Sequence, residues 1–211
     1  RPTKPTGENT KLWSRAELIT TGKPYDGLYL GDVTASDAVN EVLLWLPEKI
    51  GGKTVLSPFI ILSTDYLGGV YLLRKETVPD ITVGKWNAAY YDGSILDTTI
   101  TGTYLNSILD KSVTDKLVVC DLPIQGASSQ YETTVKIRRK AWALSYSECY
   151  AGTVDGTKMA YFTGNPRRAT NTQYWLRSRG DGYGVNNIRY VDTSGTVNIV
   201  GSSNYSFRIR P

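Results

Sequence analysis

Few residues of this chain have side chains suited to catalysis or metal binding. Among its 211 residues there is no histidine, and the two cysteines, Cys120 and Cys149, form no C-x-x-C motif. Zinc sites are mostly built from Cys and His, so we expect no metal site of that kind and no cofactor. The lack of histidine also removes the commonest general base, which leaves a carboxylate pair of the glycosidase kind as the alternative for an enzyme. We expect a protein that is not an enzyme.

The two cysteines could form one disulfide or remain as two buried thiols. Cys120 follows an apolar run and Cys149 follows the end of an expected strand, so both positions suit buried free thiols, which we favour. The acidic residues in turn-like settings form no D-x-D-x-D-G loop and give no support for a calcium site. These residues are Asp92, Asp97, Asp155, Asp181 and Asp192.

An aromatic and a basic residue lie two positions apart in the segment Tyr174-Trp175-Leu176-Arg177-Ser178. On a strand, Trp175 and Arg177 would share one face, where an indole and a guanidinium could bracket a sugar. We include both among the candidate ligand-binding residues. The alternative, which these residues favour more strongly, is that they frame the core, with Arg177 bonded to backbone carbonyls or to a carboxylate such as Glu148.

Two glycine-rich stretches near the C-terminus have the composition of binding loops. Residues 180–187 and 202–206 mix Tyr with Ser, Gly and Asn. Tyrosine supplies rigid contact area and the small polar residues supply adaptable hydrogen bonds, although the same residues also make ordinary turns between strands. The candidate binding residues here are Tyr183, Asn186, Asn187, Asn204 and Tyr205.

Short apolar runs separated by Gly, Asn and Asp indicate the elements that must position these residues. Helical spacing of apolar residues predicts one short helix over 100–115 with a start near Thr101, and Ser145 or Ser147 could cap a further helical turn. Strands are predicted over residues 42–45, 55–63, 69–74, 133–144, 174–177, 187–191, 196–200 and 207–210. The pattern favours one mixed α+β domain over residues 13–211, behind an extended Pro- and Thr-rich tether over residues 1–12.

The charge pattern argues against nucleic acid and membranes as partners. The net charge is +4, and the main basic cluster, Arg138-Arg139-Lys140, leads into an apolar segment, which is typical of a solvated strand edge. No apolar run is long enough to span a bilayer. Because the chain begins at Arg1 without methionine or a signal-like segment, we expect a processed piece of a longer protein.

Several segments resemble an uncharacterised family of bacterial and phage surface domains. Trp175-Leu176-Arg177-Ser178 resembles its W-L-R-S start, Gly195-Thr196-Val197 its G-x-V hairpin, and the closing Arg210-Pro211 its terminal R-P. Two upstream segments are similar as well, residues 102–107 to a W-L-N helix and residues 140–148 to an F-L-L-S-x-x-E strand and turn. The resemblance covers about residues 70–211. It implies a C-type-lectin-like fold, as in formylglycine-generating enzymes and in phage receptor-binding proteins; the cysteine pair of those enzymes has no counterpart here.

Together these features predict a non-enzymatic binding module of a virion, a phage receptor-binding, tail-fibre or decoration domain. Its C-terminal loops would attach to a glycan or protein of the bacterial surface, beside other virion subunits, and a homo-oligomer would fit a fibre. Two alternatives stay open: a purely structural virion protein, and a secreted or cell-surface bacterial domain for adhesion or carbohydrate binding. The expected location is extracellular, on a virion or a bacterial surface.

Overall fold

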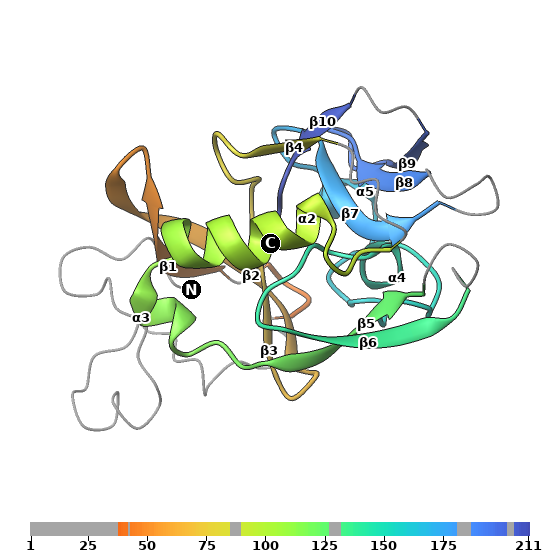
Figure 1. The fold of residues 1–211 in the computed structure, drawn as a ribbon, viewed down its shortest axis with the longest axis horizontal. Helices are drawn as coiled ribbons and strands as arrows, with labels where there is room; N and C mark the ends of the chain where they lie inside the picture. The colour runs from red at the N-terminus through yellow and green to blue at the C-terminus, as the bar shows by residue number, and fades with distance from the viewer. Residues whose placement is uncertain (1–37, 42, 85–89, 127–131, 181–186, 202–204) are drawn as a thin grey trace.

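The computed structural model describes residues 38–41, 43–84, 90–126, 132–180, 187–201 and 205–211 (Figure 1). The predicted tether over residues 1–12 lies outside them. The described chain forms a three-stranded sheet, a two-stranded sheet, a five-stranded sheet and several short helices. This confirms the predicted mixed α+β class.

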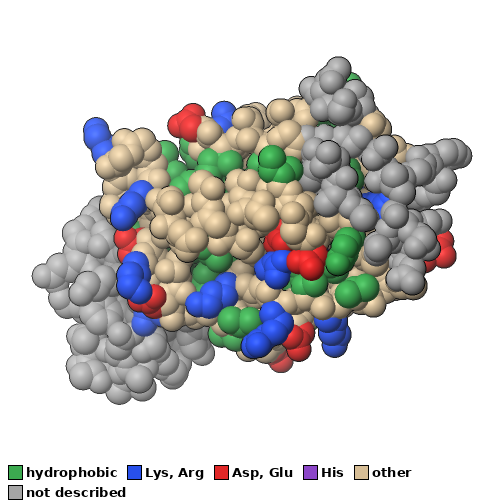
Figure 2. All heavy atoms as spheres, viewed as in Figure 1, with side chains coloured by type: hydrophobic (Ala, Val, Ile, Leu, Met, Phe, Trp, Pro, Cys, Tyr) green, Lys and Arg blue, Asp and Glu red, His purple; other side chains and the backbone are tan. Residues whose placement is uncertain are grey.

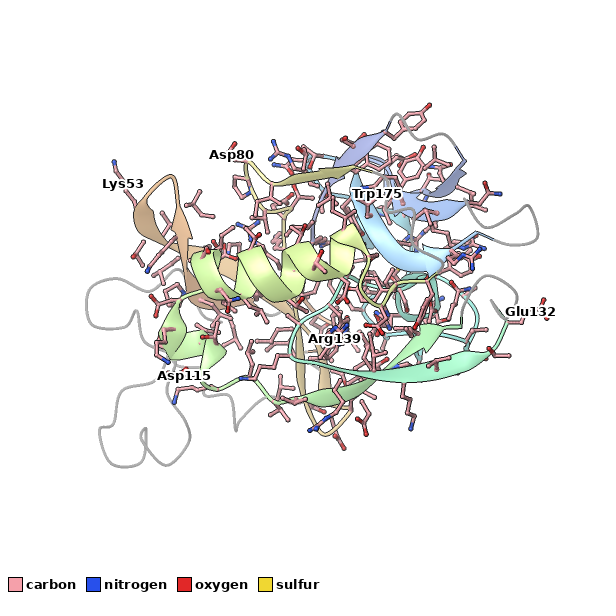
Figure 3. The ribbon with its side chains drawn as sticks, in the orientation of Figure 1. Lys53, Asp80, Asp115, Glu132, Arg139 and Trp175 are labelled. Carbon is pink, nitrogen blue, oxygen red and sulfur yellow. The ribbon has the colours of Figure 1, made fainter. Side chains whose placement is uncertain are left out.

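The three-stranded sheet is an antiparallel meander of β1 (Leu43–Ile50), β2 (Lys53–Tyr66) and β3 (Gly69–Arg74). The hairpin between β1 and β2 turns at Gly51 and Gly52, where φ is +56° and +74°, values that favour glycine. Lys53 projects from the tip of this hairpin (Figure 3). The predicted strands 42–45, 55–63 and 69–74 are thus confirmed, with β1 and β2 longer than predicted.

A continuous helical segment crosses this sheet and consists of α2 (Ile95–Thr98) and the π-helix η3 (Thr99–Ile108) (Figure 1). The prediction that the helix starts near Thr101 and runs to 115 was wrong. Ser94 caps it earlier by accepting a hydrogen bond from the Asp97 amide, and the Thr101 hydroxyl instead donates to the Asp97 carbonyl within the helix. The helix ends at Ile108, and a separate α3 (Lys111–Thr114) follows, capped by the Asp110 carboxylate.

The middle of the chain forms the antiparallel pair β5 (Cys120–Gln125) and β6 (Thr134–Arg139), then α4 (Tyr146–Cys149) and α5 (Asn165–Arg168). The predicted strand 133–144 is thus shorter than expected, since it ends at Arg139. Arg139 points from β6 toward α2, where its guanidinium donates to Asp97 and Asp92 (Figure 3). Ser145 caps α4 as one of the two predicted candidates. Figure 2 shows basic and acidic side chains interspersed on this face of the molecule.

The five-stranded sheet has the order β4-β10-β7-β8-β9 and joins β4 to the strands of the C-terminal part of the chain. Its strands confirm the four predicted after residue 173 to within about two residues. Arg208 of β10 pairs in parallel with Tyr174 of β7, and the other pairings are antiparallel. The strands are β4 (Thr82–Gly84), β7 (Tyr174–Arg179), β8 (Ile188–Val191), β9 (Val197–Val200) and β10 (Ser206–Arg208).

One main hydrophobic cluster takes side chains from all three sheets and from the helices. It includes Cys120 and Cys149, which are buried free thiols, as predicted. Burial raises the pKa of Cys149 to about 12, so this thiol stays protonated. No helix among the described residues is long and apolar enough to cross a membrane.

Candidate functional site

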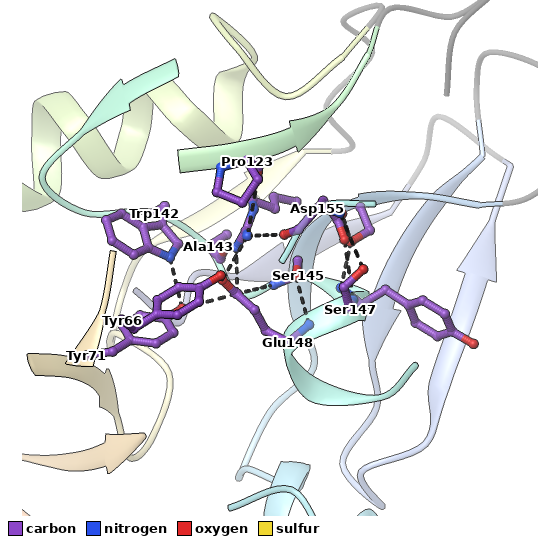
Figure 4. Close-up of polar contacts among 12 residues, drawn as sticks. Tyr66, Tyr71, Pro123, Trp142, Ala143, Ser145, Ser147, Glu148 and Asp155 are labelled. Atoms are coloured by element: carbon purple, nitrogen blue, oxygen red, sulfur yellow. Dashed lines mark hydrogen bonds and ion pairs between the residues drawn. The ribbon is translucent and has the colours of Figure 1, made fainter. Parts of the chain in front are cut away.

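Strand β7, which carries two of the candidate site residues, is buried along its whole length. Arg177 is 1% exposed, and its two terminal nitrogens donate to the two carboxylate oxygens of Glu148 at 2.6 and 2.8 Å (Figure 4). The same guanidinium also donates to the backbone carbonyls of Ala143, Asp155 and Pro123. Arg177 therefore ties β7 to β5 and to the segment around α4.

Glu148 is the other half of this buried centre and is fully enclosed. Its carboxylate accepts hydrogen bonds from the hydroxyls of Tyr66 and Tyr71 and from the Ser145 amide, while the Ser145 hydroxyl accepts from the Glu148 amide. The last two bonds form a capping box at the start of α4. Burial would lower the pKa of Arg177, but the charge of Glu148 and its hydrogen bonds raise that pKa above the usual range.

Trp175 is also enclosed, with no exposed surface. Its indole N–H donates to the Val83 carbonyl at 2.8 Å, and its ring packs 4.5 Å from that of Phe207. The assignment of Trp175 and Arg177 to a ligand site is therefore corrected. Both frame the core, as the alternative held. Glu148 and backbone carbonyls accept hydrogen bonds from the terminal nitrogens of Arg177, and the Val83 carbonyl accepts one from the Trp175 indole, while the buried Nε of Arg177 has no hydrogen-bond partner among the described residues.

The remaining candidates are placed in part. Tyr183, Asn186 and Asn204 lie outside the described residues. Asn187 lies directly before β8, where its carbonyl accepts a hydrogen bond from the Gly180 amide. A Cβ atom at Gly180 or Gly201 would come within 3.1 or 2.9 Å of the Asn187 side chain, so glycine at both positions gives this asparagine its room. Tyr205 precedes β10 and is 47% exposed.

Tyr205 continues a line of aromatic rings that reaches from the core to the surface. Its ring centroid lies 5.8 Å from that of Phe207, which lies 4.6 Å from that of Tyr190. We call Tyr190, Phe207 and Tyr205 the aromatic row. Asn198 of β9 is directly paired with Tyr190 of β8, so an amide side chain stands next to the row. Sequence analysis included Tyr205 but missed Tyr190, whose place opposite Asn198 depends on strand register.

A second feature, which sequence analysis missed, is a cavity of about 250 Å³ on another part of the molecule. It lies between the β2–β3 hairpin, η3, α3 and the start of β5. Its wall includes Tyr66, Tyr71 and Trp142, whose rings pack in sequence with centroids 5.0 and 5.3 Å apart. The lining residues come from segments far apart in the sequence, from Leu46 to Pro211, so no local pattern indicates the cavity.

Within the part of the chain that the structure describes, no three or more Cys, Asp or Glu side chains are placed to hold a metal ion. The most enclosed carboxylates, Glu148 and Glu48, are each engaged by a buried arginine and by tyrosine hydroxyls. At the described surface, the exposed ring of Tyr205 lies near the half-buried Tyr190 and the Asn198 amide, and an apolar cavity lies elsewhere.

Comparison with known proteins identifies a family that part of the chain matches. No curated protein and no solved structure matches the chain significantly. Residues 68–211 match a family described as a domain of unknown function, DUF6273. This match begins at the turn before β3 and takes in the aromatic row, the Arg177–Glu148 centre and much of the cavity wall. Since it covers more than half of the sequence, the chain belongs to the DUF6273 family.

Proposed function

We propose that this protein is a non-enzymatic binding module of a virion, a receptor-binding, tail-fibre or decoration domain that attaches to a glycan or protein of the bacterial surface. The observation that carries the proposal is the aromatic row, which ends in the exposed ring of Tyr205 next to the C-terminal loops. Aromatic faces beside amide groups suit both sugar rings and protein surfaces.

The support beneath the row favours recognition. Phe207 packs on Trp175, and the Trp175 indole is fixed by its bond to Val83. A ring held by a packed core loses little conformational entropy when a ligand binds, which favours affinity. Loops that carry binding residues on a rigid scaffold are common in recognition domains.

We further propose that the fold is C-type-lectin-like. In support, the strands are short and mostly antiparallel, the helices are few, and the early strand β4 pairs with the last strand, β10. The resemblance of the C-terminal segments to phage and bacterial surface domains favours the same fold. Two other roles are compatible with this fold: that of a purely structural virion protein, and that of a secreted or surface-attached bacterial domain for adhesion or carbohydrate binding.

Binding of the labelled chain to a panel of whole bacterial cells tests the function. We expect strain-selective binding that falls roughly tenfold in the variant Tyr205→Ala, the scale of a lost aromatic contact at an interface. Tyr150→Ala is the matched control, because Tyr150 is similarly exposed, at 44%, and lies outside the row. Equal loss in both variants, or no loss in either, would contradict the row as the binding surface.

Absence of binding to every strain would instead favour the structural virion role. Neighbouring genes separate the remaining alternatives: virion genes support a phage module, whereas a signal peptide and a wall anchor support a bacterial surface domain.

A further inference from the structure

We propose that the cavity beside the Tyr66–Tyr71–Trp142 wall is a second binding site, and that its ligand is a small amphiphilic carboxylate with an aryl or short alkyl body. The cavity is lined by other elements than the aromatic row, so this inference is independent of the attachment function. Three properties of the cavity carry the proposal: an interior with few free polar groups, its volume, and the charge at its rim.

The interior is apolar because the polar atoms of its aromatic residues are bonded elsewhere. The hydroxyls of Tyr66 and Tyr71 donate to Glu148, and the Tyr104 hydroxyl donates to Glu48 at 2.6 Å. The Trp142 indole N–H donates to the Tyr71 oxygen at 2.9 Å. Because these polar groups are hydrogen-bonded to Glu148, to Glu48 or to one another, mainly aromatic rings and aliphatic side chains face the cavity.

The hydroxyls remain engaged across the physiological pH range. Burial, followed by the charge of Glu148, raises the pKa of Tyr66 and of Tyr71 well above the usual value. Burial and the charge of Glu48 do the same to the pKa of Tyr104. The hydroxyls therefore stay protonated and keep donating to their carboxylates, so the wall presents the same apolar character throughout.

The volume limits the size of the apolar body. An apolar protein cavity of about 150 Å³ accommodates benzene. A cavity of about 250 Å³ therefore has room for a body near the size of two fused aromatic rings. It is too small for a long lipid chain to be enclosed.

The rim favours a negative head group. Lys140 is exposed and lines the cavity, and none of the described lining residues is aspartate or glutamate. Exposed Val118 and Val119 continue the apolar surface outward, at 56% and 42% exposure. In the view of Figure 2, basic side chains stand beside hydrophobic ones along the lower part of the molecule. An anion on an apolar body matches both features at once.

Isothermal titration calorimetry of the whole chain with naphthalene-2-carboxylate tests the proposal, with naphthalene-2-carboxamide as the neutral analogue. We expect the carboxylate to bind roughly twofold to fivefold more tightly, the scale of one exposed charge contact. The variant K140Q should lose this preference but retain weak binding of both probes. The matched control K136Q removes the same charge at an exposed position that does not line the cavity.

Two filling variants, A141F and L117W, test the location. Both positions line the cavity and are only partly buried, so the larger side chains can enter it without replacing a core residue. Loss of binding in a filling variant that keeps the parental Tm supports the site. The proposal is overturned if the parental chain binds neither probe, if the carboxamide binds as tightly as the carboxylate, or if folded filling variants bind unchanged.

Discussion

Replacing Glu148 with glutamine removes one charge from the buried centre and leaves its shape nearly unchanged. Arg177 would then keep its bonds to backbone carbonyls but lose the carboxylate with which it forms an ion pair, in a place where both side chains have no exposed surface. Breaking a buried ion pair by removing one partner costs about 3–5 kcal/mol. At roughly 2–4 °C of Tm per kcal/mol for a chain of this size, we expect Tm to fall by roughly 6–20 °C.

Thermal and urea unfolding followed by circular dichroism measure this effect. Lys111→Ala is the control, since it breaks an ion pair whose side chains are 84% and 57% exposed and should change the free energy of unfolding by about 0.5 kcal/mol or less. If Glu148→Gln costs no more than this control, the buried pair does not hold the core together as argued. A loss of about 3 kcal/mol or more supports the argument.

Three further predictions concern the hairpin after β8 and the two thiols. Gly195→Ala should lower the free energy of unfolding by more than about 2 kcal/mol in urea titrations, because φ is +82° and a Cβ would lie 1.9 Å from the Asn165 carbonyl oxygen; a neutral result would refute the close contact. Partial burial would raise the pKa of Asp192, but hydrogen bonds from the turn lower it below its ordinary value of 3.8. The ionised carboxylate therefore stabilises the fold at pH values above 3.8, and this stabilisation is lost as the pH falls through the lower pKa of the folded state. Asp192→Asn should therefore cost about 1 kcal/mol at pH 7 and progressively less below about pH 4, and a pH-independent difference would contradict this. A small thiol reagent, followed by mass spectrometry, should label Cys120, which lines the cavity, before the enclosed Cys149, whose labelling should await unfolding; the reverse order would contradict the described burial.

The strands and one cap could be predicted because their signals are local. Alternating or continuous apolar runs bounded by Gly, Asn and Asp located the strands of the C-terminal sheet, and the Ser145–Glu148 spacing fits the capping box that α4 has. The start of the long helix was missed because Ser94 precedes Ile95, a residue 52% exposed, so no apolar periodicity marks that first turn. The sequence pattern around Ser94 therefore does not mark the point where the helix begins.

The candidate site was predicted only in part, for a physical reason. An aromatic and a basic residue with strand spacing form an exposed face only if no other segment packs on them. Arg177 is instead buried against Glu148, which is remote in the sequence. The same holds for the cavity, whose wall joins segments from Leu46 of β1 to Pro211. Tyr205, by contrast, lies in a loop-like sequence beside β10, and its exposure agrees with that composition.

The pairing of residues 74–84 with the C-terminal residues 207–211 sets the order in which the protein can fold. Val83 of β4 pairs with Phe207, the Val78 amide donates to the Ile209 carbonyl, and buried Arg210 donates to the carbonyl of Arg74. During synthesis, residues 74–84 therefore wait for the C-terminal residues to be made before these contacts can form. A nascent chain interrupted before residue 206 leaves that edge of the sheet unpaired and exposes the apolar surface that Phe207 and Ile209 would cover, which makes incomplete chains targets for aggregation or proteolysis.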